Sequence, residues 1–255
     1  MNFELKNMPV RTNKPRESGI SMIMDKGLSL REIEDMLSVA GSYIDIVKLG
    51  FGSAAVTPIL DEKIALYKSH KIPLYFGGTL LESFIIRGQF EDYIRLLDRY
   101  QLDFAEVSDG SIDMEHEQKC EYIRRLAKQA TIFSEVGSKD AEKIIPPYKW
   151  IAQMKTELEA GAWKVIAEAR EGGNVGIYRG TGEVRSGLVE EILTQIKPED
   201  IVWEAPNKSQ QVWFIKLLGS NVNLGNIAPN EVIPLETLRL GLRGDTLEFF
   251  AKPQA

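Results

Sequence analysis

Residues 104–136 read FAEVSDGSIDMEHEQKCEYIRRLAKQATIFSEV, and they contain the unit that decides the fold. Two short runs rich in β-branched and aromatic residues, 104–107 and 131–136, predict strands. Between them Cys120 and Ile123 lie on an apolar stripe with helical spacing, which predicts an amphipathic helix. A strand, a helix and a second strand in this order indicate two parallel strands joined by a helical crossover.

The same alternation continues in both directions along the chain. Strands are predicted at 21–25, 43–48, 73–76, 104–107, 131–136, 163–168, 201–204 and 222–224. Helical stripes are predicted at 30–40, where Ser29 and Glu32 form a capping box, and at 59–67, 90–100, 120–127, 151–158, 188–196, 210–218 and 234–242. Eight such units match a (β/α)8 TIM barrel, whereas an open doubly wound sheet usually has fewer strands. We therefore expect an α/β protein with this barrel.

The size of the chain fits one such barrel. It has 255 residues, of which 44% are hydrophobic and 27% charged, so it can bury a full core. No linker or low-complexity segment interrupts the pattern. We expect residues 1–255 to form a single domain, with about the first 18 residues as a short extended lead-in that covers the bottom of the barrel or reaches a neighbouring subunit.

Composition also limits the compartment and the partners. No stretch approaches the ~20 consecutive apolar residues of a membrane helix, and the N-terminus has no secretory apolar core, so we expect a cytoplasmic protein without a membrane partner. The single cysteine, Cys120, cannot form an internal disulfide and is interpreted as core packing. A net charge of -6, without long blocks of either sign, disfavours nucleic acid as a partner. Exposed helices leave room for a homo-oligomer.

Acidic residues recur where a barrel carries its catalytic groups, at the carboxyl ends of the strands. The fourth to seventh predicted strands each end in or beside a glutamate: Glu106, Glu135, Glu168 and Glu204. Converging carboxylates raise one another's pKa unless a cation lies among them, and hard carboxylate oxygens suit Mg²⁺. The pattern indicates a metal or anionic-substrate site. The alternative is that each glutamate is structural and pairs with Lys48, Lys26 or Arg170.

Cationic residues occupy the same strand ends. They are Lys26, Lys48, Lys139, Arg170 and Lys208, a set suited to an anionic substrate, although each taken singly is more often a solvated loop residue. Barrel phosphate sites favour the loops after strands seven and eight. That preference points to Lys208, Ser209, Gly225 and Asn226 as phosphate-binding residues.

These segments, taken in order, resemble the phosphosulfolactate synthase family. The resemblance rests on KPR at 14–16, DKGL at 25–28, IDIVKLGFG at 44–52, YFGGTL at 75–80, EVSDG at 106–110, EVG at 135–137, EARE at 168–171, EAPNKSQQ at 204–211, NLGNI at 223–227 and LGLRGDT at 240–246. It extends over nearly the whole chain, from about residue 14 to 246. It implies a (β/α)8 barrel that uses Mg²⁺ to add sulfite to phosphoenolpyruvate, giving (2R)-O-phospho-3-sulfolactate. This step belongs to coenzyme M biosynthesis in archaea and to sulfolactate production in spore-forming bacteria.

The implied activity suggests a role for each group of candidates. We expect Glu135, Glu168 and Glu204, or a subset, to hold Mg²⁺, and Lys139 to protonate the central carbon of the substrate. Lys48, Arg170 and Lys208 would neutralise the phosphate and the sulfite. Two other functions stay open: a stress-associated, non-catalytic barrel protein, as plant relatives of the family suggest, and another Mg²⁺-dependent phosphoenolpyruvate or enolate enzyme.

Overall fold

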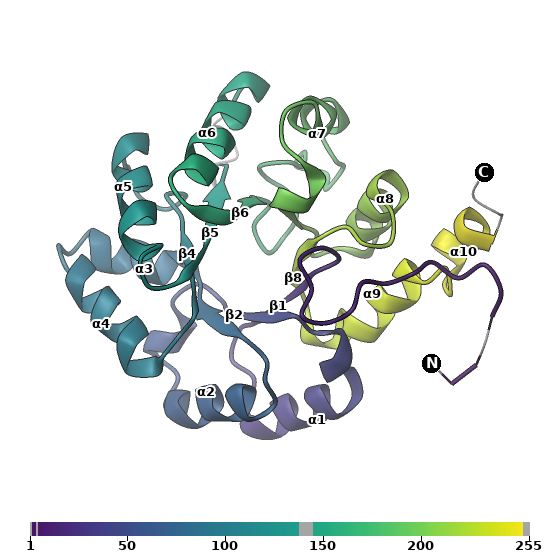
Figure 1. Cartoon of the computed structure of the whole chain (residues 1–255), viewed down its shortest axis with the longest axis horizontal. Helices are drawn as coiled ribbons and strands as arrows, with labels where there is room; N and C mark the ends of the chain where they lie inside the picture. Colours follow the sequence, from purple (N-terminus) through teal and green to yellow (C-terminus); the bar gives the residue numbers. More distant parts are fainter. Residues whose placement is uncertain (1, 4, 138–144, 252–255) are drawn as a thin grey trace.

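The structure is a computed structural model and describes residues 2–3, 5–137 and 145–251. Its eight strands form one parallel sheet that curls into a nearly closed barrel, which confirms the predicted fold (Figure 1). The strands are β1 Ser21–Asp25, β2 Ile46–Leu49, β3 Leu74–Phe76, β4 Phe104–Val107, β5 Thr131–Val136, β6 Ala162–Ala167, β7 Ile201–Glu204 and β8 Leu224–Ile227.

Helices surround the strands and cover the outside of the barrel (Figure 1). They are α1 Leu30–Ala40, α2 Leu60–Ser69, α3 Gly78–Ile85, α4 Phe90–Tyr100, α5 His116–Leu126, α6 Pro147–Glu159, α7 Ser186–Leu193, α8 Lys208–Leu218, α9 Val232–Arg239 and α10 Gly244–Ala251. The predicted capping box is present at the start of α1, where Ser29 and Glu32 each bond the other's backbone N–H. In the part of the chain that the structure describes, no helix is both long and apolar enough to cross a membrane.

The sheet runs in the order β3-β2-β1-β8-β7-β6-β5-β4, so β3 and β4 are its two edges. Hydrogen bonds to side-chain carboxylates join the two sides of this seam. Glu106 on β4 accepts a bond of 2.7 Å from the backbone N–H of Gly78, and the Ser108 hydroxyl donates a bond of 2.5 Å to Glu82 on α3. The barrel is thus held together at the seam by buried carboxylates instead of a main-chain ladder.

Two layers of apolar side chains hold the strands in place. A small cluster that includes Met22, Tyr75 and Phe133 fills the inside of the barrel. A larger cluster packs the outer faces of the strands against the helices, and Cys120 lies in it with none of its surface exposed, as predicted. Because strands covered on both faces move little, the groups at their ends are held at fixed positions.

The N-terminal segment runs across the amino ends of the strands. Arg11 bonds Glu236 on α9 at 2.9 Å, and Arg16 bonds Asp45 at 2.9 Å. Asp45 in turn accepts the backbone N–H of Ser21 at the start of β1. Residues 11–16 are therefore fixed to the bottom of the barrel, opposite the end at which we expect the chemistry.

The main differences from the predicted elements concern β2, β8 and α3. β2 begins at Ile46 and not at residue 43, because Gly41–Tyr43 forms a 3-10 helix. β8 spans Leu224–Ile227 and not 222–224, so Gly225 and Asn226 lie within the strand. The helix α3 was not predicted, because its first residue is Gly78 and glycine lowers helix propensity.

Candidate active site

A cavity of about 280 Å³ opens at the carboxyl ends of the strands. We call it the mouth. It is lined by Met24, Lys48, Phe51, Gly78, Thr79, Glu106, Glu135, Glu168, Arg170, Glu171, Glu204 and Asn226. This is the end at which barrel enzymes carry their catalytic groups.

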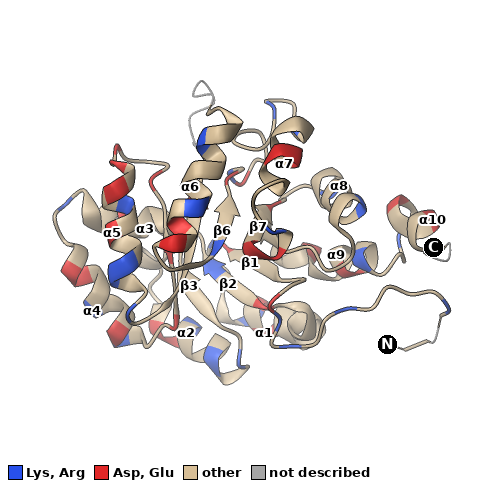
Figure 2. Cartoon of the chain, turned by 45° about the horizontal axis from the view of Figure 1, so that its top comes forward, with Lys and Arg blue, Asp and Glu red and all other residues tan. Residues whose placement is uncertain are grey.

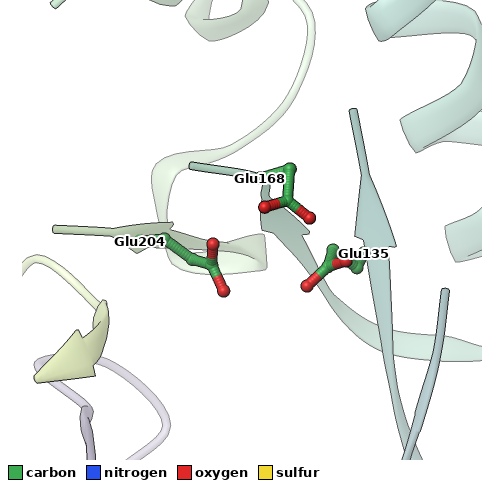
Figure 3. Close-up of side chains that lie close together, drawn as sticks. All are labelled: Glu135, Glu168 and Glu204. Atoms are coloured by element: carbon green, nitrogen blue, oxygen red, sulfur yellow. The ribbon is translucent and has the colours of Figure 1, made fainter. Parts of the chain in front are cut away.

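Three buried glutamates meet in the mouth. Glu135 lies near the end of β5, Glu168 directly after β6, and Glu204 at the end of β7. The close-up in Figure 3 shows their carboxylates turned toward one another, and one oxygen from each lies within 4.8 Å of the others. We call these three residues the glutamate cluster. Three neighbouring strands thus supply one acidic group each to a single point.

Lys48 on β2 approaches this cluster from the opposite wall. Its Nζ lies 2.9 Å from Glu106, 3.4 Å from Glu135 and 3.5 Å from Glu204. Burial alone would lower the pKa of Lys48, but the three carboxylates outweigh it and hold the pKa well above its ordinary value. Lys48 is therefore a permanent cation in the mouth.

One ammonium group does not balance the carboxylates that face it. Burial, together with the charges of Glu135 and Glu106, raises the pKa of Glu204 to about 7, although Lys48 opposes the shift. Burial likewise raises the pKa of Glu106, although Lys48 opposes the shift. Negative charge is therefore concentrated here at a cost in free energy, as is typical of functional sites.

Backbone N–H groups fix the directions of the carboxylates. Glu204 accepts a bond of 2.9 Å from the backbone of Ala169, and Glu168 accepts one of 2.5 Å from the backbone of Arg170. Arg170 has a φ of 54°, in the left-handed region, which turns its N–H back toward Glu168. The loop after β6 thereby holds two members of the glutamate cluster.

The comparison of sequences decides the family. The sequence model of the (2R)-phospho-3-sulfolactate synthase (ComA) family matches residues 9–245. The chain belongs to this family. The phosphosulfolactate synthase of Bacillus subtilis is 42% identical over 242 residues, which cover 94% of this chain and 96% of the relative. That of Methanothermobacter thermautotrophicus is 38% identical over 245 residues, covering 94% and 95%. The chain is an enzyme of the phosphosulfolactate synthase type.

More distant relatives share less with the chain. Protein HEAT-STRESS-ASSOCIATED 32 of Arabidopsis thaliana is 21% identical over 258 residues, covering 90% of this chain and 88% of the relative. Among solved structures, 3-hexulose-6-phosphate synthase from Salmonella typhimurium aligns with a TM-score of 0.58 at 14% identity, covering 87% of this chain and 99% of that one. The structural likeness concerns the barrel fold alone.

The structure brings some of the predicted site residues of this phosphosulfolactate synthase family member into the mouth. Lys48, Arg170 and Asn226 line it together with the glutamate cluster. Asn226 has a φ of 56° and is buried, and its Oδ1 has no hydrogen-bond partner within the described ranges. Lys26 lies at the rim, where its half-exposed side chain pairs with Glu171 at 3.1 Å.

The other candidates lie elsewhere. Lys208 pairs with Asp245 on α10 at 3.1 Å, and Ser209 is exposed in the first turn of α8. A Cβ on Gly225 would lie 3.1 Å from Val202 and 3.3 Å from Met22, so this residue packs against the inside of the barrel. The structure does not gather these three residues in the mouth with Asn226. Lys139, the predicted proton donor, falls outside the described residues.

Sequence reasoning missed part of the lining. Phe51 and Thr79 line the mouth and were not candidates. Gly78 appeared only within the YFGGTL segment, yet its N–H fixes Glu106, the nearest partner of Lys48. Their positions directly after β2 and β3 were the available signal, but they carry no charge that would have singled them out.

The donors in the mouth fit a hard divalent cation. Carboxylate oxygens are the ligands that Mg²⁺ prefers, and the glutamate cluster offers three within 4.8 Å of one another. A divalent cation would also offset the repulsion that, in addition to burial, raises the pKa of Glu204. The described residues of the mouth thus satisfy both the ligand chemistry and the charge requirement of such an ion.

Proposed function

We propose that this chain is a Mg²⁺-dependent phosphosulfolactate synthase that adds sulfite to phosphoenolpyruvate and forms (2R)-O-phospho-3-sulfolactate. The observation that carries the proposal is the buried glutamate cluster at the mouth of a family member. Glu135, Glu168 and Glu204 would hold the ion. When bound, it would supply positive charge against the negative charge that builds on the substrate carboxylate during the reaction.

The proposed reaction joins two anions without losing the phosphate. The sulfur lone pair of sulfite forms a C–S bond to the methylene carbon of phosphoenolpyruvate. The electrons of the C=C bond move to the central carbon, which takes up one proton. The phosphate ester stays intact, so no group leaves and no phosphoenzyme forms.

The chain's own cations would bind and orient the anionic substrates. Lys48 stays charged because three carboxylates surround it, and it lies on the wall of the mouth opposite β6. Arg170 also lines the mouth and can offer its guanidinium to a phosphate or sulfite oxygen. Lys139 remains the proposed proton donor to the central carbon, because the two histidines, His70 and His116, are not among the described residues that line the mouth. Buried walls around the mouth exclude water from the reacting groups.

The proposal is tested by incubating the purified enzyme with phosphoenolpyruvate and a panel of nucleophiles. We expect product with sulfite alone, detected as a new phosphate ester by ³¹P NMR, and loss of activity on chelation that Mg²⁺ restores. Unchanged activity after complete removal of metal would overturn the Mg²⁺ assignment. Product with a different nucleophile would identify another phosphoenolpyruvate enzyme, and no product with any nucleophile would favour a non-catalytic protein.

A further inference from the structure

The members of the glutamate cluster share a feature in their main chains. Each of their carbonyl oxygens accepts a hydrogen bond from a group outside the strands. The donors are Lys119 Nζ for Glu135 at 2.6 Å, the backbone N–H of Ile177 for Glu168 at 3.1 Å, and the Tyr178 hydroxyl for Glu204 at 2.6 Å. All three strand ends are thus held from outside the sheet.

Two of these donors are adjacent residues of the loop between β6 and α7. Tyr178 pairs with Val184 in an antiparallel bridge, and the N–H of Arg185 bonds the carbonyl of Ile177 at 2.9 Å, so residues 176–185 form a small hairpin. Gly176 precedes them with a φ of 62°, and a Cβ on it would lie only 1.9 Å from the carbonyl oxygen of Glu168. Only glycine allows the hairpin to approach the strand end this closely.

The loop is anchored on α8. The side chain of Gln210 donates to the carbonyl oxygens of Gly173 at 2.7 Å and Gly182 at 3.1 Å. Asn207, at the start of the same helix, donates to Gly172 at 3.1 Å. These bonds connect the hairpin to a helix of the barrel, so its donors are held at fixed positions.

The third donor is a buried charge on α5. The Lys119 side chain is 1% exposed, and its Nζ also contacts Glu157 at 2.9 Å and Asp109 at 3.0 Å. Glu157 accepts a further bond of 2.5 Å from Ser134, the residue before Glu135. Lys119 therefore has partners on both sides of β5 and fixes the main chain at the carboxyl end of this strand.

We infer that Tyr178 and Lys119 are positioning residues, which hold the main chain at Glu204 and Glu135 so that the glutamate cluster keeps the geometry for binding a divalent cation. The inference rests on the proposed function. Functional groups must be held to within about 0.5 Å and 10–20°, and a peptide group that rotates at a strand end moves the side chain attached to it. Partners that orient metal-binding groups without touching the metal typically contribute about 10- to 100-fold to affinity.

The test is the substitution Tyr178→Phe, which removes one hydroxyl and keeps the buried ring. Binding of Mn²⁺ alone is measured by EPR on the full chain without substrate, and the free energy of unfolding by urea. We expect the dissociation constant for Mn²⁺ to rise about 10-fold. In the activity assay, the apparent KM for Mg²⁺ should rise by a larger factor than the KM for sulfite.

Tyr67→Phe is the matched control. Tyr67 is also fully buried, and its hydroxyl donates a bond of 2.9 Å to Asp25 at the end of β1, away from the glutamate cluster. We expect this variant to lose stability without any change in the dissociation constant for Mn²⁺. A loss of affinity that merely followed stability would appear in both variants and would overturn the inference.

The double variant Lys119→Met with Glu157→Gln tests the donor on α5 and removes one charge of each sign. We expect weaker Mn²⁺ binding again. Wild-type affinity in the double variant would overturn the role of Lys119, and wild-type affinity in Tyr178→Phe would overturn the role of Tyr178. If the double variant does not fold, Tyr178→Phe alone decides. A wild-type protein that bound no Mn²⁺ would instead refute the metal part of the proposed function, which is a separate result.

Discussion

The two ends of the barrel both bury charge, but the buried charges have different kinds of partner. At the mouth, Lys48 faces three carboxylates, and the pKa of Glu204 rises to about 7 because burial and neighbouring charges disfavour its ionised form. At the amino end the buried charges include an arginine that donates to main-chain carbonyl oxygens. Arg239 is fully buried and donates to the carbonyl oxygens of Ser220 and Val222 at 2.7 Å and of Ile20 at 3.1 Å.

Cavity volume does not identify the functional end, because the larger cavities are not at the mouth. Two hollows of about 570 and 460 Å³ lie at the amino end, and both are larger than the mouth. However, three of their four cations already have partners, and the fourth, Lys71, is exposed. Lys68 donates to the carbonyl oxygen of Gln101 at 2.9 Å, Lys14 donates to that of Gly41 at 3.0 Å, and Arg16 is paired with Asp45.

The difference concerns which polar groups are left for a ligand. Donors that bond main-chain carbonyls of the same chain stabilise the fold, whereas like charges crowded at one point favour binding of an opposite charge. Figure 2 shows acidic and basic residues spread along the whole chain, so net charge alone does not locate the site. The local imbalance at the mouth does.

Glu204→Gln should give the largest effect. If it left the activity unchanged, the contrast between a functional mouth and a structural amino end would be wrong. The substitution keeps the shape and removes one charge from the glutamate cluster. We expect sulfite-dependent turnover to fall by roughly 100- to 1,000-fold, as when other preorganised polar groups are removed from active sites. Because a carboxyl group with a raised pKa destabilises the folded protein when it is ionised, the free energy of unfolding at pH 8 should rise.

Both quantities are measured on the same preparation, turnover by ³¹P NMR and stability by urea unfolding. A variant that lost stability while it kept its activity would show that Glu204 is structural. That outcome would support the alternative in which each strand-end glutamate simply pairs with a neighbouring cation.

Arg239→Met tests the amino end in the opposite sense. The variant leaves three buried carbonyl oxygens without their charged donor, and we expect a loss of about 3 kcal/mol in the free energy of unfolding. Burial and the charge of Arg11 lower the pKa of Arg239 to about 9, so the wild-type side chain still carries its charge at neutral pH. Activity per folded molecule should stay at the wild-type level in conditions where the variant is folded, and a drop in turnover without a drop in stability would contradict a structural role.

Much of the fold could be predicted from the sequence, because the strands of a barrel are marked by local runs of apolar residues. The predicted bounds of β1, β4, β5 and β7 agree with the structure to the residue, since apolar runs set them. Prediction failed where local residues are atypical. Gly225 and Asn226 are poor strand formers, so the sequence did not show β8 beyond Leu224.

The partners of the charged residues could not be predicted in the same way. Their positions at strand ends predicted that Glu135, Glu168 and Glu204 lie at the carboxyl end of the barrel, and the structure brings them together. Nothing local, however, indicates that Lys119 and Arg239 are buried, because their acceptors lie on other elements. Likewise Lys208, which was predicted to bind phosphate, pairs with Asp245, a residue that follows the last predicted helix.

Lys26→Ala should give the smallest effect, and it tests whether the functional part of the mouth extends to its rim. Lys26 and Glu171 pair at 3.1 Å across the rim with side chains that are 51% and 54% exposed, so breaking the pair should change the free energy of unfolding by less than ~1 kcal/mol. As a cation next to the mouth, Lys26 should contribute to binding the phosphate, and we expect the KM for phosphoenolpyruvate to rise about 10-fold at low salt with little change in kcat.

Glu171→Gln is the control for Lys26→Ala, because it breaks the same ion pair and leaves the lysine in place. Its KM for phosphoenolpyruvate should stay equal to the wild-type value or fall, since Lys26 is then released toward the substrate. If both variants raised KM equally, the ion pair itself and not the charge of Lys26 would shape the rim. If neither did, Lys26 would belong with the solvated loop lysines and the functional part of the mouth would end at Lys48 and Arg170.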